Sequence, residues 1–579
     1  MSYLVPATDD IQVNSITKNE QDDARIAALP NGGFVVVWES LNAKGDRNDI
    51  YQQVYDADGT PVGRNVRLNT DRSYTNYNPV VEVLSDGSWV VVWGEYDRED
   101  NVQEVKARMI RADGVPRAEE FTVNEFTYGD QDWPDVSATE DGGFIVVWDS
   151  FHVWTANGVD YETLEIRSRE FDSSGEEVET DKSLLYSMYN SRFPQVTTLE
   201  NGEILVVWQY PEYDSNGNRT SSRNEGLVLT KEVYFEGHSS ALLLGEDFSG
   251  IFSVEALEDD RFVVAGWTVV DGVNQVVVQV YENGPYRFET ISEPVYTKVS
   301  GLDVYEPRLA ATADGGFVLT YTVDTIPGYA DDGGQEDTYI QRYDADGKKA
   351  GAPVRVSEIS APGQFQFDSD ITVLEGGQIV SVWEGFPGDG SSGVYIRMFE
   401  PHLVGTTGRD ILRGSAADDN ISGRGGNDRL SGSSGDDNIH GGRGRDNLRG
   451  QNGNDRLEGD GGDDRLAGGK GQDVLIGGRG NDTLDGGRGD DLLKGGAGAD
   501  HFVFSTGKDK IAKFNDGTDT LVLDKFALGI EQLNAAEILE THGRMAGDNL
   551  AILDFGGGDI LKIRGVSDLS SLADDIIFT

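Results

Sequence analysis

The chain has 579 residues, a formal net charge of −54 and no cysteine. This length predicts several domains, the acidic balance argues against nucleic acid and anionic membranes as partners, and the absence of cysteine excludes disulfides and thiolate metal sites. The first residues, MSYLVPATDD, lack a charged segment followed by an apolar core, so we expect no ordinary secretory signal peptide there. No apolar run approaches the roughly 18 residues of a membrane-spanning helix.

Residues 1–400 contain a long repeat in which a turn is followed by an apolar strand that ends in an aromatic residue. Two clear copies are NGGFVVVWES (31–40) and DGGFIVVWDS (141–150). Each unit also contains a strand before the turn and two strands after it, which predicts four antiparallel strands in about 55 residues, the pattern of a β-propeller blade. The aromatic residue recurs seven times, as Trp38, Trp93, Trp148, Trp208, Trp267, Tyr321 and Trp383. We therefore expect an all-β fold that begins with a seven-bladed propeller over residues 1–400.

The two ends of this region predict how the ring closes. The seventh unit ends at its third strand, GVYIRMFE (393–400), and no fourth strand follows. Near the start of the chain, IQVNS (11–15) resembles the fourth strands of other units, such as VRLNT (66–70). We expect residues 11–15 to complete blade seven, which would remove an exposed sheet edge.

Candidate functional residues in the propeller are few, because the chain contains no HExxH, GxSxG or phosphate-loop motif. The segment FHVWTANGVDY (151–161), expected as a loop between the second and third strands of blade three, combines a histidine with aromatic residues. One interpretation is a platform that stacks on a sugar, with a catalytic acid or base beside it. The other is a long loop that packs on itself. The catalytic candidates are His152 and Tyr210, and the ligand-binding candidates are Trp133, Trp154 and Tyr213.

Acidic residues directly follow four of the repeated aromatics, as Glu39, Glu95, Asp149 and Glu384. They could form a ring on one face of the propeller, and paired carboxylates would suit glycoside hydrolysis. Because acidic residues occur throughout the chain, their pairing does not follow from the sequence. We expect the repeated aromatics themselves to be structural, since every unit has one.

From Gly405 to Val503 the sequence repeats the pattern G-x-x-G-x-D-x-U-x eleven times, where U is a large apolar residue. Position four is glycine except for Ala417. Position six is aspartate in every copy: Asp410, Asp419, Asp428, Asp437, Asp446, Asp455, Asp464, Asp473, Asp482, Asp491 and Asp500.

Each position of this repeat predicts a physical role. The U residue points inward from a short strand, and the glycines allow turns with positive φ. Two repeats would form one 18-residue coil, so that aspartates of alternate repeats stack on the same edge. Stacked carboxylates repel each other unless a cation lies between them, and oxygen-only ligands favour calcium. Without calcium we expect the segment to be largely unfolded, like a disordered Gly/Asp-rich linker.

The repeat resembles that of the RTX family, whose consensus is GGxGxDxUx. The resemblance implies a parallel β-roll over residues 401–503 that binds several calcium ions through the position-six aspartates and turn carbonyls. The copy GSAADDNIS (414–422) lacks the position-four glycine, so we expect weaker sites at that turn. Position two is glycine in only five copies, most of them late, so we expect the strongest sites at about 441–500. The implied carbonyl ligands lie near Gly408, Gly426, Gly435, Gly444, Gly453, Gly462, Gly471, Gly480, Gly489 and Gly498.

Residues 504–579 leave the repeat and are expected to form a β-rich cap over the last coil. They are similar to the C-terminal cap of RTX proteins, which implies an uncleaved signal read by a type I secretion apparatus. The resemblance therefore implies a bacterial protein that is secreted or attached to the cell surface. Low cytosolic calcium would keep the roll unfolded during export.

Three functional hypotheses follow. The first is a non-enzymatic binding protein whose propeller binds an extracellular or cell-surface ligand, such as a polysaccharide, in adhesion or in a biofilm matrix. The second is a polysaccharide-degrading hydrolase or lyase with its site on the propeller face. The third is a surface-layer or matrix protein that calcium assembles.

Overall fold

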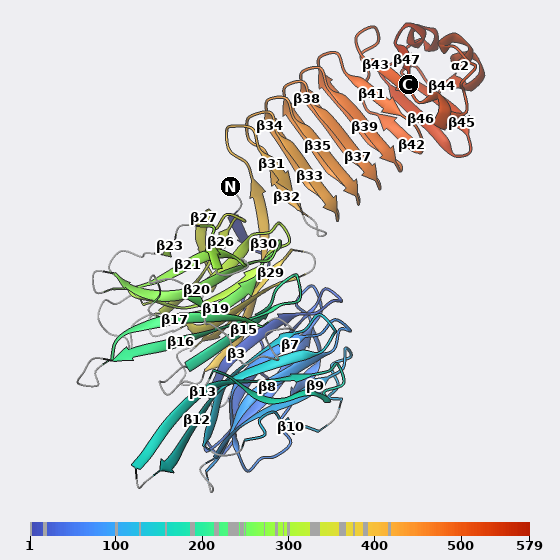
Figure 1. The fold of residues 1–579 in the computed structure, drawn as a ribbon. Helices are drawn as coiled ribbons and strands as arrows, with labels where there is room; N and C mark the ends of the chain where they lie inside the picture. The colour runs from blue at the N-terminus through green and yellow to red at the C-terminus, as the bar shows by residue number, and fades with distance from the viewer. Residues whose placement is uncertain are drawn as a thin grey trace. The chain divides into compact units, whose positions relative to one another are not determined.

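The computed structural model describes residues 3–15, 20–98, 102–117, 119–126, 129–156, 159–185, 192–213, 219–229, 242–243, 248, 250–270, 273–283, 288–292, 294–297, 302–324, 336–357, 366–374, 377–385, 392–414 and 419–579. They form two compact units, one of residues 6–399 and one of residues 1–5 with 400–579 (Figure 1). The fold is all-β apart from short helices near the C-terminus. Within the described residues, no helix has the length and apolar character needed to cross a membrane.

The first unit is a β-propeller with six separate antiparallel sheets. Consecutive strands pair within these sheets, as expected for blades built from consecutive hairpins, except that β23 pairs with β21 rather than with β22. The strands are β3 (Gln21–Ala28), β4 (Phe34–Leu41), β5 (Asn48–Tyr55), β6 (Pro61–Arg67), β7 (Thr75–Val83), β8 (Trp89–Asp97), β9 (Val102–Ile110), β10 (Phe121–Thr122), β11 (Asp130–Ala138), β12 (Phe144–Ala156), β13 (Val159–Phe171), β14 (Glu177–Leu185), β15 (Arg192–Thr198), β16 (Ile204–Tyr213), β17 (Arg219–Leu229), β18 (Leu242–Leu243), β19 (Gly250–Ala256), β20 (Arg261–Val270), β21 (Val273–Asn283), β22 (Phe288–Thr290), β23 (Val295–Thr297), β24 (Val304–Ala311), β25 (Phe317–Asp324), β26 (Glu336–Tyr343) and β27 (Lys349–Arg355).

A further antiparallel set consists of β28 (Gln366–Val373), β29 (Ile379–Gly385) and β30 (Gly393–Val404). The N-terminal strands β1 (Tyr3–Pro6) and β2 (Ile11–Gln12) both pair with β30. The last residues of β30 pair in parallel with the first strands of the second unit, so this set belongs to a larger sheet rather than to a separate one.

The repeated apolar strands lie between neighbouring sheets, as their composition predicts. In β4, Phe34 and the three valines after it are fully buried, and Trp38 is almost fully buried. The indole Nε1 of Trp38 donates a hydrogen bond to Oε1 of Gln21 on the adjacent strand at 3.1 Å, and Trp148 makes the same bond to Gln131 at 2.9 Å. The repeated tryptophans are therefore structural, as expected.

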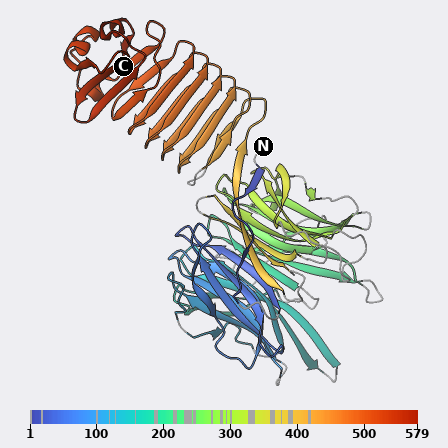
Figure 2. The same cartoon turned by 180° about the vertical axis from the view of Figure 1, so that it is seen from behind.

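The second unit begins as a parallel β-roll with two facing sheets, which Figure 2 shows from behind. Throughout the nonapeptide repeats each strand pairs with the strand two places along, and residue i is opposite residue i + 18, as in Leu448 with Leu466. The predicted 18-residue coil is therefore confirmed. The strands are β31 (Ile411–Arg413), β32 (Asn420–Ser422), β33 (Arg429–Ser434), β34 (Asn438–Arg443), β35 (Asn447–Asn452), β36 (Arg456–Gly461), β37 (Arg465–Lys470), β38 (Val474–Arg479), β39 (Thr483–Arg488), β40 (Leu492–Ala497), β41 (His501–Phe504), β42 (Lys508–Ile511) and β43 (Thr520–Leu523).

The C-terminal residues extend both sheets of the roll and cover its apolar interior. Strand β46 (Asp559–Arg564) pairs in parallel with β42, and β47 (Ile576–Phe578) pairs with β43. Buried residues of this segment join the same core as the inward-facing leucines of the repeats. The remaining elements are α1 (Lys525–Leu528), α2 (Ala535–His542), β44 (Gly543–Met545), β45 (Leu550–Gly556) and the 3₁₀ helix η2 (Leu569–Asp574).

Candidate functional site

The position-six aspartates of the roll form two stacked rows. In each row, the backbone N–H of one aspartate donates a hydrogen bond to the side chain of the aspartate one coil later. Asp446 Oδ1 accepts a hydrogen bond from the backbone N–H of Asp428 at 2.8 Å, and Asp464 Oδ1 accepts one from Asp446 at 2.8 Å. The bond recurs down both rows and fixes the rotamer of each aspartate. From Asp419 to Asp500 these side chains are almost fully buried.

The second carboxylate oxygen of these aspartates is the feature that fits a metal ion. In seven of them, Oδ2 is buried and accepts no hydrogen bond: Asp428, Asp446, Asp464, Asp473, Asp482, Asp491 and Asp500. A buried carboxylate oxygen without a donor is costly, and a hard cation with oxygen ligands offsets that cost. The implied calcium therefore fits the residues present. When bound, it would supply positive charge between carboxylates of successive coils.

The position-four glycines are required by the same geometry. Gly462, for example, has φ +141° and packs directly against the carbonyl oxygen of Gly444 on the preceding coil. A Cβ atom at this position would overlap that oxygen. The turn carbonyls named from the RTX resemblance therefore stack closely in two series, each joining alternate repeats, and their role as ligands stays a prediction. Ala417, which replaces one of these glycines, lies outside the described residues.

Two carboxylates beyond the last predicted repeat continue the rows. Asp509 Oδ1 accepts from the backbone N–H of Asp491, and Asp519 Oδ1 accepts from that of Asp500, both at 3.1 Å. The sequence contains a signal for the first, because Gly507, Asp509 and Ile511 keep positions four, six and eight of the repeat. Asp519 lies 19 residues after Asp500 instead of 18, so the nine-residue period does not predict it.

The propeller encloses a polar channel with a volume of about 530 Å³. Its wall consists of residues from the first strand of every blade and from β28. Each of these strands contains a register shift, and at six of the shifts a residue other than glycine has positive φ, as in Asp23 (φ 49°) and Asp368 (φ 44°). This recurrent bulge changes the direction in which the side chains after it point.

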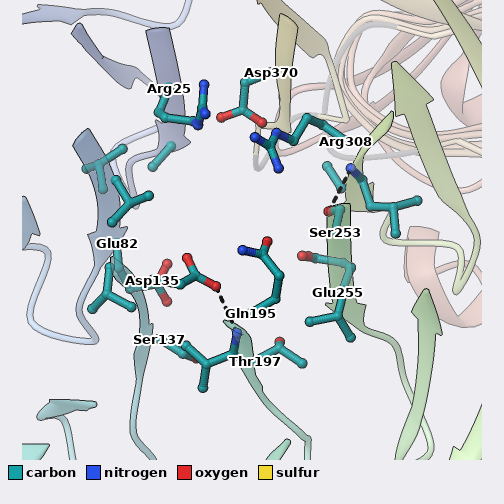
Figure 3. Close-up of a pocket in the computed structure, with 18 of the residues that line it drawn as sticks. Arg25, Glu82, Asp135, Ser137, Gln195, Thr197, Ser253, Glu255, Arg308 and Asp370 are labelled. Atoms are coloured by element: carbon teal, nitrogen blue, oxygen red, sulfur yellow. Dashed lines mark hydrogen bonds between the residues drawn. The ribbon is translucent and has the colours of Figure 1, made fainter. Parts of the chain in front are cut away.

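Charged side chains in the channel are segregated. Figure 3 shows Arg25 and Arg308 beside Asp370, whereas Glu82, Asp135 and Glu255 lie farther around the wall, with Gln195 pointing inward between them. The carboxylates also join neighbouring strands. Glu82 accepts a hydrogen bond from the backbone N–H of Ala138 at 3.0 Å, and Asp135 accepts one from Val196 at 2.8 Å.

Burial raises the pKa of all three carboxyl groups on that part of the wall, to about 7 for Glu82, about 6 for Asp135 and about 8 for Glu255. The backbone hydrogen bonds that each accepts act in the opposite direction but are outweighed by burial. Carboxyl groups in a cleft with pKa values near neutrality can exchange protons with a ligand.

These raised pKa values predict that the propeller loses stability as the pH rises. A carboxyl whose pKa is higher in the folded state favours folding most fully below its unfolded pKa of about 4, and this contribution is lost as the pH rises through 6 to 8. We expect the melting temperature of the propeller to fall between pH 5 and pH 9 in excess calcium. Glu255→Gln should flatten this dependence, whereas Asp113→Asn, at an exposed turn, should not. An unchanged slope in Glu255→Gln would contradict the assignment.

The structure describes one of the five propeller candidates in full. Trp133 lines the channel, is 43% exposed and makes an edge-to-face contact with Phe193 at 4.9 Å between ring centroids. The backbones of the other four lie in β12 and β16, but their side chains are outside the described residues: His152, Trp154, Tyr210 and Tyr213. Sequence reasoning missed Arg25, Glu82, Glu255 and Arg308 as channel residues.

The expectation of a loop at 151–161 was wrong. Strand β12 continues to Ala156 and β13 begins at Val159, so the two strands form a long hairpin. The aromatic and β-branched residues of FHVWTA are types enriched in strands, and this composition was the signal for the longer hairpin.

Two of the acidic residues that follow the repeated aromatics, Glu39 and Asp149, join neighbouring blades. Glu39 Oε1 accepts a hydrogen bond from the backbone N–H of Asn78 at 2.6 Å, and Asp149 Oδ1 accepts one from Phe193 at 3.1 Å. Both donors are the positive-φ residues of the next blade. Glu95 instead forms an ion pair with Lys106 at 3.3 Å. These contacts give three of the four acids a structural role.

Comparison with known proteins identifies the roll. The family model of the RTX calcium-binding nonapeptide repeat matches residues 404–439, 440–475 and 476–511. This segment therefore consists of RTX repeats, which bind Ca²⁺ in the β-roll, and proteins with such repeats are typically secreted by bacteria. No curated protein matches the chain.

Several solved structures are similar to parts of this chain at low identity. They include a protein of unknown function from Dyadobacter fermentans DSM 18053, with 12% identity and a TM-score of 0.39 over 57% of this chain and 96% of that chain. A polysaccharide lyase described as an ulvan lyase has 11% identity and a TM-score of 0.41 over 68% and 95%. The propeller domain of the Trilobed protease from Pyrococcus furiosus has 12% identity and a TM-score of 0.37 over 65% and 96%. Likeness at this level carries no functional argument.

Proposed function

We propose that this protein is a secreted, calcium-dependent binding protein whose propeller channel holds a polar ligand, such as a sugar unit of an extracellular polysaccharide. The channel carries the proposal, because its volume of about 530 Å³ is within the usual range for small-molecule sites. Its wall offers guanidinium donors, carboxylate acceptors and amides. Sugar hydroxyls both donate and accept hydrogen bonds, so a mixed wall of this kind suits them.

Binding is favoured over catalysis because three channel carboxylates already accept hydrogen bonds from the protein backbone. Glu82, Asp135 and Asp370 each accept a backbone hydrogen bond from the neighbouring inner strand. Groups that hold the wall together in this way are fixed in position, which suits a preorganised binding surface.

A second candidate, a polysaccharide-degrading enzyme, is favoured by one observation. The pKa values of Glu82 and Glu255, raised by burial to about 7 and about 8, are those of groups that could act as general acids near neutral pH. This function predicts turnover of a polysaccharide, which the first does not.

The test is calorimetric titration of the calcium-loaded full chain with a panel of acidic and neutral oligosaccharides. We expect Gln195→Ala to lower the affinity by about tenfold, since one hydrogen bond contributes about 1 kcal/mol. Gln103→Ala on β9, which does not line the channel, is the matched control. Equal affinities for the two variants would contradict the channel as the site. Release of shorter sugars would favour the enzyme, and light scattering that grows with calcium would favour a self-assembling matrix protein.

We also propose that β28, β29, β30 and β2 form the seventh blade. The backbone N–H of Ile26 on β3 donates to Asp370 Oδ2 on β28 at 3.0 Å, and the N–H of Val196 on β15 donates in the same way to Asp135 on β11. The same bond thus links β28 to β3 as links consecutive blades. The proposal extends to export, in which residues 504–579 would contain the signal for a type I secretion apparatus.

A further inference from the structure

Three carboxylates of the propeller meet outside the roll. Asp22 lies on β3, Asp368 on β28 and Glu384 on β29. One oxygen of each carboxylate lies within 4.8 Å of the other two. Two oxygens on the same calcium ion are at most about 5 Å apart, because each calcium–oxygen bond is about 2.3–2.6 Å long. The spacing therefore fits a single ion.

Glu384 supplies an independent reason to place a cation there. It is only 1% exposed, and its Oε1 accepts no hydrogen bond. Glu39 and Asp149, which occupy the same position in their own blades, accept hydrogen bonds from backbone N–H groups of the next blade. Glu384 Oε1 has no such donor, so its charge is left for a proton or a cation to neutralise.

The surroundings carry far more negative than positive charge. Among the described residues, Arg25 and Arg308 interact with the cluster, and Arg25 also lies 3.9 Å from Asp23 and donates to the carbonyl oxygen of Ala24 at 2.9 Å. The carboxylates that interact with one another or with these two arginines include Asp22, Asp23, Glu39, Glu306, Asp368, Asp370 and Glu384. In this set the carboxylates outnumber the guanidinium groups.

The pKa shifts agree with this geometry. Burial raises the pKa of Glu384 well above its usual value, and the nearby carboxylates of Asp22 and Asp368 raise it further. Burial likewise raises the pKa of Asp368, with Glu306 and Asp23 acting in the same direction. Repulsion of this kind between clustered acids disappears when a divalent cation binds between them.

We propose that Asp22, Asp368 and Glu384 bind a calcium ion that fastens β3 to β28 and β29. Oxygen-only ligands select a hard cation, and calcium accepts the irregular geometry of side chains from three strands, whereas magnesium requires shorter bonds in a near-ideal octahedron. The ion is distinct from those of the RTX repeats. It joins the first inner strand of the propeller to the last one.

Terbium luminescence of the full chain tests this site separately from the roll. Terbium replaces calcium at oxygen sites and emits when a nearby indole transfers energy to it. All tryptophans precede residue 384, and no tryptophan or tyrosine follows Tyr395. The repeats therefore contain no indole of their own to sensitise their ions, whereas Glu384 directly follows Trp383. We expect tryptophan-sensitised emission that saturates with terbium and is displaced by calcium.

Two variants and one control decide the result. Asp22→Asn and Glu384→Gln should each weaken the calcium-displaceable signal by about tenfold or more in affinity. Glu95→Gln is the matched control, because Glu95 follows Trp93 as Glu384 follows Trp383 but has Lys106 as its partner. Its signal should equal that of the unaltered protein. Emission that calcium does not displace, or that both site variants retain in full, would overturn the proposal. Tryptophan fluorescence of each variant reports whether its propeller is folded.

Discussion

Removal of calcium with a chelator is expected to unfold the parallel roll while the blades of the propeller persist. Without ions, the buried Oδ2 atoms of the stacked aspartates have neither a hydrogen-bond donor nor a cation, as in Asp464 and Asp482. One inward apolar residue in nine gives a thin core that does not offset this cost. The blades have a different core, with fully buried valines in each central strand and an almost fully buried tryptophan in most of them.

Hydrogen exchange measured by mass spectrometry resolves the two regions. In calcium, amides of β33 to β40 should be protected, and in chelator their exchange should approach that of an unstructured peptide. Amides of β4 and β8 should stay protected under both conditions. Magnesium at the same concentration should restore little protection, because it demands shorter bonds and stricter geometry. Persistent protection of β33 to β40 in chelator would contradict a calcium-dependent fold.

Two adjacent glycines are expected to differ sharply in their tolerance of alanine. Gly462 has φ +141°, and a Cβ atom would overlap the carbonyl oxygen of Gly444. At Gly461 the nearest atom to a Cβ, the carbonyl oxygen of Gly442, is 3.8 Å away, and φ is not positive. We expect Gly462→Ala to cost about 3 kcal/mol or more, from backbone strain together with the displacement of a coil. Gly461→Ala should change stability by about 0.5 kcal/mol or less.

Thermal unfolding in saturating calcium measures the difference. For a unit of this size, a cost of about 3 kcal/mol corresponds to a fall of about 6–12 °C in melting temperature. Gly461→Ala carries the same added methyl group one residue away and is therefore an exact chemical control. Similar melting temperatures for the two variants would show that the coils are not stacked as the structure has them.

The roll was predictable because its determinants are local and periodic. Glycine, aspartate and leucine recur every nine residues, so the period alone defines the coil, its 18-residue register and the alignment of Asp446 with Asp464. The continuation to Asp509 was also within reach, since Gly507 and Ile511 keep the pattern.

The channel was not predictable in the same way. Arg25, Glu82, Asp135, Glu255 and Arg308 come from strands that lie far apart in the sequence, and only the closed ring brings them together. The sequences of these strands nevertheless contain a weaker signal for the bulge. A proline directly follows the positive-φ residue in four of the inner strands, at Pro79, Pro134, Pro194 and Pro307. That recurrence marks the bulge and hence the residues that face the axis.

The aspartate rows give the roll a polarity. Each Oδ1 accepts from the backbone N–H of the aspartate one coil earlier, so in these two rows the side-chain acceptor always comes from the coil that follows. The final donors, at Asp491 and Asp500, are satisfied by Asp509 and Asp519 at the start of the cap. The aspartate rows therefore have a direction, and the last acceptors they need are supplied by the cap. We expect removal of Asp509 and Asp519 to disturb the last coils of the roll first.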